Sequence, residues 1–543
     1  MTIQQNIINA SQATPVELPE STLQGEFVED VCNDFFAPAP TDAVDRLVAR
    51  YREEAANVLT VGEFVQSHAY RSALHHFIAG NTEGSLAVRG DMYSVEGALG
   101  HLNGVYWREL LQMTDVFDYM PYARKVEWEE QITGGKAPAF EESTVRSTLQ
   151  TMLTQRSIFF AERVDGVFRA LSQTHLTNNP AGFASRFIID YAESKAGYIS
   201  DLRVVISRFM GHPETPTGNG SKLLRMLSKR TGEWHFVDGA ALRMKMFKVG
   251  TCHVEVHPEI AARLNSLLAL LYPTAIPSRF RTRPTRPPKE FPVLSRSLPQ
   301  AVISILCEPK RPGEINYRRV TENPNAVVFY ADSPHVDEAY RVLEALGGVR
   351  HNKNRYVWFE FDYDPLPAIE QVAISGLVPD DKSHQFYPTR ERMADLAAEL
   401  ADIQDEHDCL EPSAGNGALA AKMPLERTTC VEIAPMRCAV LSSKGYRTVQ
   451  ADFLVWASKT SERFDRIVLN PPFANNRATM HLQAAAGLLR QQGRLVAILP
   501  ASLRGKDLVP DWDWDLEWHG PFENQFDGTN VQVCILVAQR RTS

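Results

Sequence analysis

The sequence has no run of about 18 consecutive apolar residues, so no membrane-spanning helix is expected. Its first residues lack the basic start and the apolar segment of a secretory signal peptide. The seven cysteines are scattered and include no Cys-x-x-Cys pair, which argues against a zinc site and favours reduced thiols. We therefore expect a cytoplasmic protein with no membrane partner and no metal.

The composition that is present is ordinary for a globular protein. The 543 residues are 44% hydrophobic and 23% charged, and this length predicts about two to four domains. The net charge of −9 does not by itself suggest a nucleic-acid partner. The segment Asp201–Arg311 departs from this average, because it has 18 Lys and Arg residues against 8 Asp and Glu residues. Such a local basic region can still engage nucleic acid.

The first half of the chain has helical patterns. Residues 1–40 are polar and predict a loosely ordered N-terminus, and residues 41–272 predict a mainly helical domain in which DNA engagement is conceivable. Its clearest apolar stripe is Ser143–Leu171, most of which we expect in the core. Near its end, His253, Glu255 and His257 would share one face of a strand. Because zinc needs a fourth ligand and none is near in the sequence, we interpret this face as solvated.

Two further segments precede the last domain. Residues 273–299 predict a proline-rich linker, and residues 300–380 predict a small α/β domain. In the small α/β domain, the expected strands are Ala301–Cys307, Ala326–Tyr330 and Arg355–Phe361. The expected helices there are Val336–Leu346 and a segment near Ile369. The linker is basic and extended, so it either tracks a phosphate backbone or simply exposes its charges to water. The candidate DNA-binding residues in it are Arg279, Arg281, Arg283, Arg286 and Lys289.

The most informative stretch is Phe464–Phe473. Its apolar part, Ile467–Leu469, predicts a buried strand, and Asn470-Pro471-Pro472-Phe473 ends that strand. Two consecutive prolines cannot continue a sheet, so the chain leaves the strand as a stiff loop. In an open α/β sheet, the carboxyl ends of the strands are where ligands bind. The alternative is a stiff turn that only closes the strand.

Asn-Pro-Pro-Phe after a buried strand resembles the catalytic loop of S-adenosylmethionine-dependent methyltransferases that act on exocyclic amino nitrogens, above all N6 of adenine. The resemblance implies that the side-chain carbonyl of Asn470 and the backbone carbonyl of Pro471 accept the two N–H bonds of the target amino group. The nitrogen lone pair is thereby exposed to the methyl group. Pro472 stiffens the loop, and Phe473 stacks on a base that has left the duplex. Placement and fixed dipoles then carry the catalysis.

The resemblance spans residues 384–543 and supplies a cofactor site for S-adenosylmethionine. It implies that Glu411 holds the cofactor's amino group, that Glu432 grips its ribose at the tip of the next strand, and that Asp452 accepts from its adenosine amino group. The full Gly-x-Gly-x-x-Gly phosphate cradle is absent, and a cofactor without phosphate does not need it. We expect the remaining Gly-x-Gly to approach the cofactor at a helix N-terminus. The full set of expected cofactor contacts is Tyr387, Pro388, Thr389, Glu411, Pro412, Ser413, Ala414, Gly415, Gly417, Glu432, Ile433, Asp452, Phe453 and Asn470.

A second resemblance covers about residues 50–280. The segments Tyr106–Leu111, Asp118–Met120, Thr177–Pro180 and Phe247–His253 resemble a domain of unknown function from phage, prophage and plasmid proteins, often ahead of an adenine methyltransferase. This resemblance implies a modification or anti-restriction context. It assigns no catalytic residue.

The expected fold is multidomain: a mainly helical N-terminal region, a small α/β middle domain and a C-terminal Rossmann-like α/β methyltransferase domain. The expected activity is methylation of adenine N6 in duplex DNA with a flipped base; a cognate nuclease is not implied. Only 70 residues follow Phe473, so base-pair discrimination is expected to be modest or to come from residues 1–380. Two alternatives stay open: methylation of an RNA base or of a protein glutamine, and a non-catalytic DNA-binding anti-restriction protein on the same fold.

Overall fold

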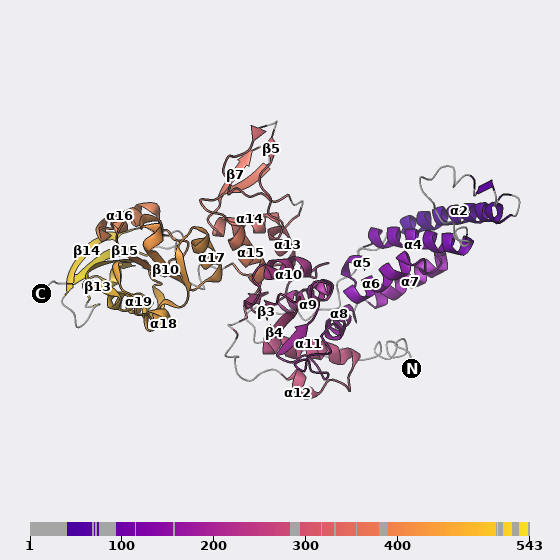
Figure 1. Cartoon of the computed structure of the whole chain (residues 1–543), viewed down its shortest axis with the longest axis horizontal. Coiled ribbons are helices and arrows are strands. Elements are labelled where there is room, and N and C mark those ends of the chain that lie inside the picture. Colours follow the sequence, from indigo (N-terminus) through magenta and orange to yellow (C-terminus); the bar gives the residue numbers. More distant parts are fainter. Residues whose placement is uncertain are drawn as a thin grey trace. The chain divides into compact units, whose positions relative to one another are not determined.

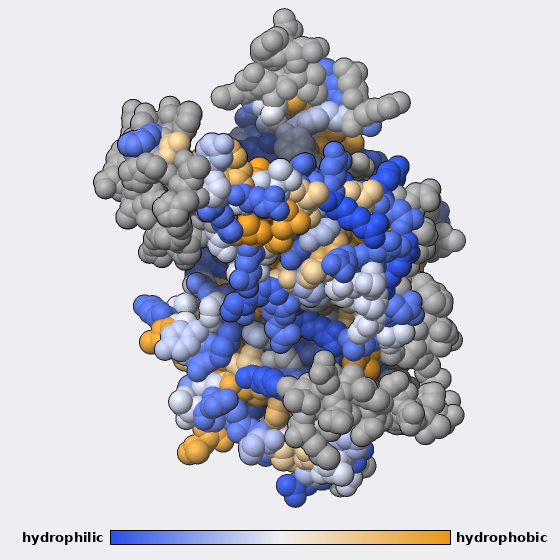
Figure 2. All heavy atoms as spheres, turned by 90° about the vertical axis from the view of Figure 1, so that its right-hand side faces the viewer, coloured by the Kyte–Doolittle hydropathy of each residue, from blue (hydrophilic) through white to orange (hydrophobic). Residues whose placement is uncertain are grey.

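The computed structural model describes residues 41–67, 94–114, 116–155, 158–282, 294–315, 318–330, 333–353, 356–378, 389–506, 514–523 and 531–540, with a few single residues between these ranges. The chain divides into two compact units, and the boundary lies between Gln300 and Ala301. None of the helices in the described part is both long and apolar enough to cross a membrane. Figure 2 shows one face of the molecule, on which hydrophilic side chains predominate and apolar ones gather in small groups.

The first unit begins with helices that run alongside one another (Figure 1). They are α2 (Thr41–Gln66), α4 (Val95–Met113), α5 (Val116–Tyr119), α6 (Tyr122–Thr133) and α7 (Glu142–Thr154). Helix α2 buries Val44, Leu47, Val48 and Tyr51, which follow helical spacing along it. They pack in one apolar cluster with side chains of α4, Trp107 among them.

The apolar stripe Ser143–Leu171 forms two helices, α7 and α8 (Phe159–Arg169), with a break after Thr154. The rest of the unit contains α9 (Ala196–Phe209), α10 (Gly220–Ser228), α11 (Pro258–Leu271), α12 (Ser278–Arg281) and four strands: β1 (Arg186–Ile189), β2 (His235–Val237), β3 (Leu242–Met246) and β4 (Cys252–Val256). The strands form an antiparallel sheet in the order β1-β4-β3-β2. The mainly helical region therefore includes a complete sheet, of which the sequence analysis found only the β4 strand.

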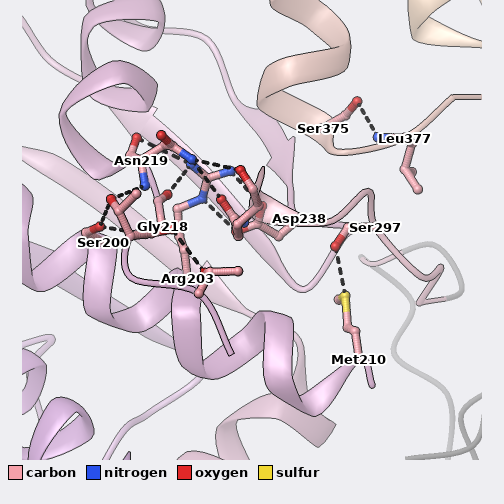
Figure 3. A network of polar contacts seen from close by, with 12 residues as sticks. Ser200, Arg203, Met210, Gly218, Asn219, Asp238, Ser297, Ser375 and Leu377 are labelled. Atoms are coloured by element: carbon pink, nitrogen blue, oxygen red, sulfur yellow. Dashed lines mark hydrogen bonds and ion pairs between the residues drawn. The ribbon is translucent and has the colours of Figure 1, made fainter. Parts of the chain in front are cut away.

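A buried ion pair joins helix α9 to the loop after β2 (Figure 3). The guanidinium of Arg203 donates from Nε and Nη2 to the two carboxylate oxygens of Asp238, at 2.8 and 2.7 Å. Its Nη1 donates to the carbonyl oxygen of Gly218 at 2.6 Å. Both charged side chains are fully buried. Because each is paired and hydrogen-bonded, the pair fixes the helix against the sheet, and loss of one partner alone would be costly.

The second unit starts with residues 301–378, and two strands predicted there are wrong. The expected strand Ala301–Cys307 is helix α13 (Gln300–Leu306), in which Val302, Ile303 and Leu306 are buried. Its β-branched composition favours a strand, and tertiary packing overrides that preference. Ala326–Tyr330 is extended but makes only isolated bridges, Lys310 to Val328 and Val327 to Phe359. The two predicted helices are confirmed as α14 (Val336–Ala345) and α15 (Leu366–Ser375), and the predicted strand Arg355–Phe361 is confirmed as β8 (Tyr356–Glu360). Three strands of this segment were not predicted: β5 (Glu314–Ile315), β6 (Arg318–Arg319) and β7 (Val349–Lys353).

The rest of the second unit is a seven-stranded sheet in the order β11-β10-β9-β12-β13-β15-β14. Its strands are β9 (Cys409–Pro412), β10 (Thr428–Glu432), β11 (Arg447–Gln450), β12 (Phe464–Leu469), β13 (Leu489–Pro500), β14 (Trp514–Phe522) and β15 (Val533–Arg540). The first five are parallel, and β15 runs antiparallel to β13. The order reverses direction from β9, which pairs with β10 on one side and β12 on the other. This is a doubly wound Rossmann-like sheet.

Helices cover both faces of this sheet. They are α16 (Glu391–Ala401), α17 (Pro435–Ser443), α18 (Phe453–Ala457) and α19 (Arg477–Gly487). Helix α16 packs with β12, β13 and β15, and α19 packs with β13 and α18. Strand β10 is buried along its whole length, and β12 is buried at Phe464 and at Ile467–Leu469, as parallel strands covered on both faces require. Two apolar clusters fill the layers on either side, and Phe473 packs against both.

Candidate active site

The strand order brings the ends of three parallel strands together at one edge of the sheet. Strand β9 lies in the centre and runs into the loop Ser413–Gly417, β10 ends at Glu432, and β12 runs into Asn470–Phe473. The direction of winding changes at β9, so its carboxyl end is the switch point at which such sheets bind ligands. The predicted residues of these three segments therefore lie at one edge.

The loop after β9 is held in a tight conformation. The backbone N–H groups of Ser413 and Ala414 both donate to the carbonyl oxygen of Val431, at 2.8 and 3.0 Å. Ser413, Gly415 and Gly417 all have positive φ, of 67°, 57° and 83°. The expected α-helix after this loop is wrong, because a turn and the short 3-10 helix η2 (Ala420–Lys422) follow instead. The glycines thus serve a compact turn and not a helix N-terminus.

Two carboxylates lie behind this loop, on neighbouring strands. Glu411 is fully buried and accepts from the N–H of Ala420 at 2.7 Å. Glu432 is also buried, and its two oxygens accept from the N–H groups of Gly415 and Ala434, each at 2.8 Å. Burial raises the pKa of Glu411 well above its ordinary value, and the negative charge of Glu432 adds to the effect. The two carboxylates therefore hold the loop in place by accepting hydrogen bonds from backbone N–H groups in it and beside it.

At the end of β11, Asp452 is the N-cap of helix α18. Its carboxylate accepts from the N–H of Leu454 at 2.9 Å, and its other oxygen pairs with the Arg477 guanidinium at 2.6 Å. Burial on its own would raise the pKa of Asp452, but Arg477 and the N–H groups at the helix end hold it below its ordinary value. The next residue, Phe453, is buried. That Asp452 contacts a cofactor remains a prediction.

A further residue near the loop, His481 of α19, is buried and is not among the expected site residues. Its Nδ1 lies 3.1 Å from the hydroxyl oxygen of Ser413, and its ring lies 5.2 Å from the ring of Phe453. Burial, aided by the charge of Arg477, lowers the pKa of His481 to about 4, so the ring is neutral near pH 7. Its spacing with the buried residues Ala478, Leu482 and Ala485 on one face of α19 is a local signal that could have found it. His481 supports Ser413 in its left-handed conformation.

The Asn-Pro-Pro-Phe loop is anchored to the segment before α16. The side-chain Nδ2 of Asn470 donates to the hydroxyl oxygen of Thr389 at 3.1 Å. This bond orients the amide, and Oδ1 is then its acceptor atom. Pro471 is buried, and Pro472 and Phe473 are half-buried. Tyr387 and Pro388 lie outside the described residues.

The segment 301–378 contacts the loop after β9. The side-chain Nδ2 of Asn416 donates to the carbonyl oxygen of Ala345 at 3.2 Å. Lys444, after α17, pairs with Asp362 at 3.1 Å and lies 5.4 Å from the ring centre of Tyr363. Helix α15 packs against α17. This segment therefore belongs to the same compact unit as the sheet and borders the candidate site.

The remaining predicted residues lie in the first unit. Arg279 and Arg281 are exposed on the short helix α12, and the Arg279 guanidinium lies over the Phe280 ring, 5.4 Å from its centre. Arg283, Arg286 and Lys289 lie outside the described residues. On β4, His253 and Glu255 share the solvated face as expected, whereas His257 is the buried N-cap of α11. In the described part of the chain, no group of three or more His, Cys, Asp or Glu residues could hold a metal ion.

Comparisons with known proteins give one family match. The family model described as "Domain of unknown function (DUF4942)" matches residues 100–274, within the region that resembles such a domain. No curated protein matches the chain.

Several solved structures match about 30% of the chain. One is described as a candidate class I S-adenosylmethionine-dependent methyltransferase from Listeria monocytogenes (12% identity, 30% of this chain, 63% of that chain, TM-score 0.26). Others are the 23S rRNA methyltransferase ErmE (20% identity, 29% and 70%, TM-score 0.24) and the M protein of the type I restriction enzyme EcoKI (15% identity, 34% and 52%, TM-score 0.25). At such low TM-scores these likenesses add no weight to the site, which rests on its own geometry.

Proposed function

We propose that this protein transfers a methyl group from S-adenosylmethionine to the N6 amino group of adenine in DNA. The observation that carries the proposal is the position of Asn470-Pro471-Pro472-Phe473. This loop follows β12, and β12 pairs directly with β9, the strand that leads into the Ser413–Gly417 loop. A base bound by Asn470–Phe473 would therefore lie next to a cofactor bound by Ser413–Gly417, as methyl transfer between them requires.

The residues at the ends of β9 and β10 fit this cofactor. S-adenosylmethionine carries a positive ammonium and a positive sulfonium, and it supplies the activated methyl group when bound. The two buried carboxylates of Glu411 and Glu432 would be stabilised by such a cation, which explains why so costly a pair is retained. Ile433 follows Glu432 directly and is 48% exposed, which offers an apolar surface for the adenine ring of the cofactor. Thr389, Pro412, Ala414 and Phe453 complete this proposed set.

The loop residues would carry the chemistry without a general base. The amino nitrogen of adenine is a weak nucleophile because its lone pair is delocalised into the ring. Asn470 Oδ1 and the Pro471 carbonyl oxygen would accept its two N–H bonds and turn the lone pair toward the methyl group. Thr389 holds the Asn470 amide in position, so the acceptor is placed before the base arrives. Phe473 would stack on the extruded base.

The substrate and context are part of the proposal. Duplex DNA with a flipped adenine suits the loop, and sequence preference would be modest. A cytoplasmic modification or anti-restriction role in a phage, prophage or plasmid is part of this proposal, and it rests on the sequence resemblance of about residues 50–280 alone. Arg279 and Arg281 are exposed cations that could meet phosphates.

The test uses Asn470→Ala with Asn352→Ala, an exposed residue of β7, as the matched control. Methyl transfer to DNA and affinity for S-adenosylmethionine are measured for both. We expect Asn470→Ala to abolish transfer and to leave cofactor affinity within a few-fold, and Asn352→Ala to change neither. Normal transfer by Asn470→Ala would remove this residue from the mechanism. Transfer to RNA or to protein instead of DNA would move the function to those substrates, and cofactor binding without any transfer would favour a non-catalytic role.

A further inference from the structure

The four-stranded sheet of the first unit has one apolar face and one charged face. In β3 and β4, buried residues alternate with partly exposed ones. The buried positions are Leu242, Met244, Met246, Cys252, Val254 and Val256. The partly exposed positions are Arg243, Lys245, His253 and Glu255, and the exposed Arg186 of β1 lies opposite Glu255. This second face is called the charged face below.

Cations predominate on this charged face. The strand register sets Arg243 opposite Glu255 and Lys245 opposite His253, so these four side chains form a compact group across two strands. Arg186 adds a third permanent positive charge beside them. Glu255 is the one carboxylate among these strand residues, and it lies 3.4 Å from Arg243. The face as described has more positive than negative charge.

Aromatic rings lie among these cations. Three cationic groups lie near the Trp234 ring: Arg243 at 4.9 Å, Arg186 at 5.6 Å and Lys245 at 6.0 Å from its centre. Lys245 also lies 5.2 Å from the centre of the Phe247 ring. A single cation over a ring is a common stabilising contact. Three like charges around one ring repel one another, so the arrangement favours the arrival of an anion.

The pKa of His253 is affected by the same cations. Burial lowers the pKa of His253, and the positive charges of Arg186 and Lys245 lower it further. Arg186 also donates to His253 Nδ1 at 2.7 Å, which requires that nitrogen to be unprotonated. The imidazole is therefore a neutral ring among cations. It lies 4.5 Å from the Phe247 ring, so the two form a second aromatic patch on the face.

We propose that this face binds an unpaired DNA strand. Phosphates would meet Arg186, Arg243 and Lys245, and bases would stack on Trp234 and Phe247, because an unpaired strand offers both its backbone charge and its ring faces at once. A duplex hides the ring faces and would use only the cations. The choice of DNA rests on the proposed function, in which an adenine leaves its duplex and the opposite strand loses a partner.

The test measures binding to the full-length protein by fluorescence anisotropy, with labelled single-stranded DNA, the corresponding duplex and single-stranded RNA of the same sequence. The first variant is Arg243→Gln with Lys245→Gln. Its matched control is Arg225→Gln with Lys229→Gln, which removes the same charge from two exposed positions, one on α10 and one directly after it. We expect the first variant to bind single-stranded DNA at least tenfold more weakly, with a salt slope smaller by about 1.4, and the control to stay within twofold. Equal losses in both variants would overturn the proposal.

Two further variants separate stacking and charge from misfolding. Trp234→Ala should weaken single-stranded DNA binding by about tenfold, and Trp234→Phe should restore most of it. Glu255→Gln removes the carboxylate of the face and should tighten binding several-fold, a gain that a misfolded protein cannot give. A wild-type protein that prefers the duplex or RNA, or a Glu255→Gln variant that binds more weakly, would also overturn the proposal. The binding assay does not depend on methyl transfer. Loss of this proposal would therefore leave the proposed methyltransferase activity standing, and absence of that activity would leave the binding result standing.

Discussion

Replacement of Gly417 by alanine tests how tightly the loop after β9 is specified. A Cβ atom at this position would lie 2.9 Å from Cδ2 of Leu441, a fully buried side chain that has little room to move. The backbone φ of 83° adds strain for any residue with a side chain. The strain costs about 1–2 kcal/mol, and the forced contact adds about 1–3 kcal/mol. Gly417→Ala should therefore destabilise the second unit by about 2–5 kcal/mol.

Gly505 provides the matched control. Its φ is 77°, and nothing lies within 4 Å of the Cβ that alanine would add, so Gly505→Ala carries the strain without the contact. We expect Gly417→Ala to have the lower Tm of the two, by about 2–4 °C for each kcal/mol of difference. We also expect it to bind S-adenosylmethionine more weakly, while Gly505→Ala binds normally. Calorimetric melting and cofactor titration measure both. Equal Tm values and equal affinities would refute the view that contact with Leu441 defines the loop.

Three further predictions concern titratable groups. Because burial raises the pKa of Glu411, a positive cofactor should bind more tightly as pH rises through that pKa; Glu411→Gln should flatten the dependence in calorimetric titrations. Burial lowers the pKa of His481 from an ordinary 6.5 to about 4, so the unfolded chain takes up the proton at a higher pH than the folded protein does. The free energy of unfolding should therefore fall by up to about 3 kcal/mol as pH falls from 6.5 to 4. A denaturation series of His481→Leu should lack this loss. Asp452→Asn keeps an acceptor for the N–H of Leu454 but loses the ion pair with Arg477, so it should weaken cofactor binding, and an unchanged dissociation constant would reject that assignment.

The sheet of the second unit was predictable because its signals are local. A buried parallel strand is a short apolar run, and its carboxyl end is marked by a change to Gly, Pro, Glu or Asn. The strands that end at Glu432 and Leu469 were placed in this way, and both agree with the structure.

The errors arose where tertiary contacts decide the structure. The segment Gln300–Leu306 has the β-branched composition of a strand and is a helix, since its environment buries neighbouring residues that a strand would turn to opposite faces. The contact between Ser413 and His481 joins residues 68 positions apart, and no local pattern reports it. The charged face of the four-stranded sheet likewise depends on register, which sets Lys245 beside His253.

The most direct test of the central claim is a transfer assay. Purified protein is incubated with labelled S-adenosylmethionine and unmethylated duplex DNA, and the DNA is then digested to nucleosides and examined by mass spectrometry. The position of Asn470 at the end of β12, the strand that pairs with β9, predicts N6-methyladenine, formed by the wild-type protein and not by Asn470→Ala. Label that appears only on RNA or on protein, or N6-methyladenine that forms equally well with Asn470→Ala, would contradict the account.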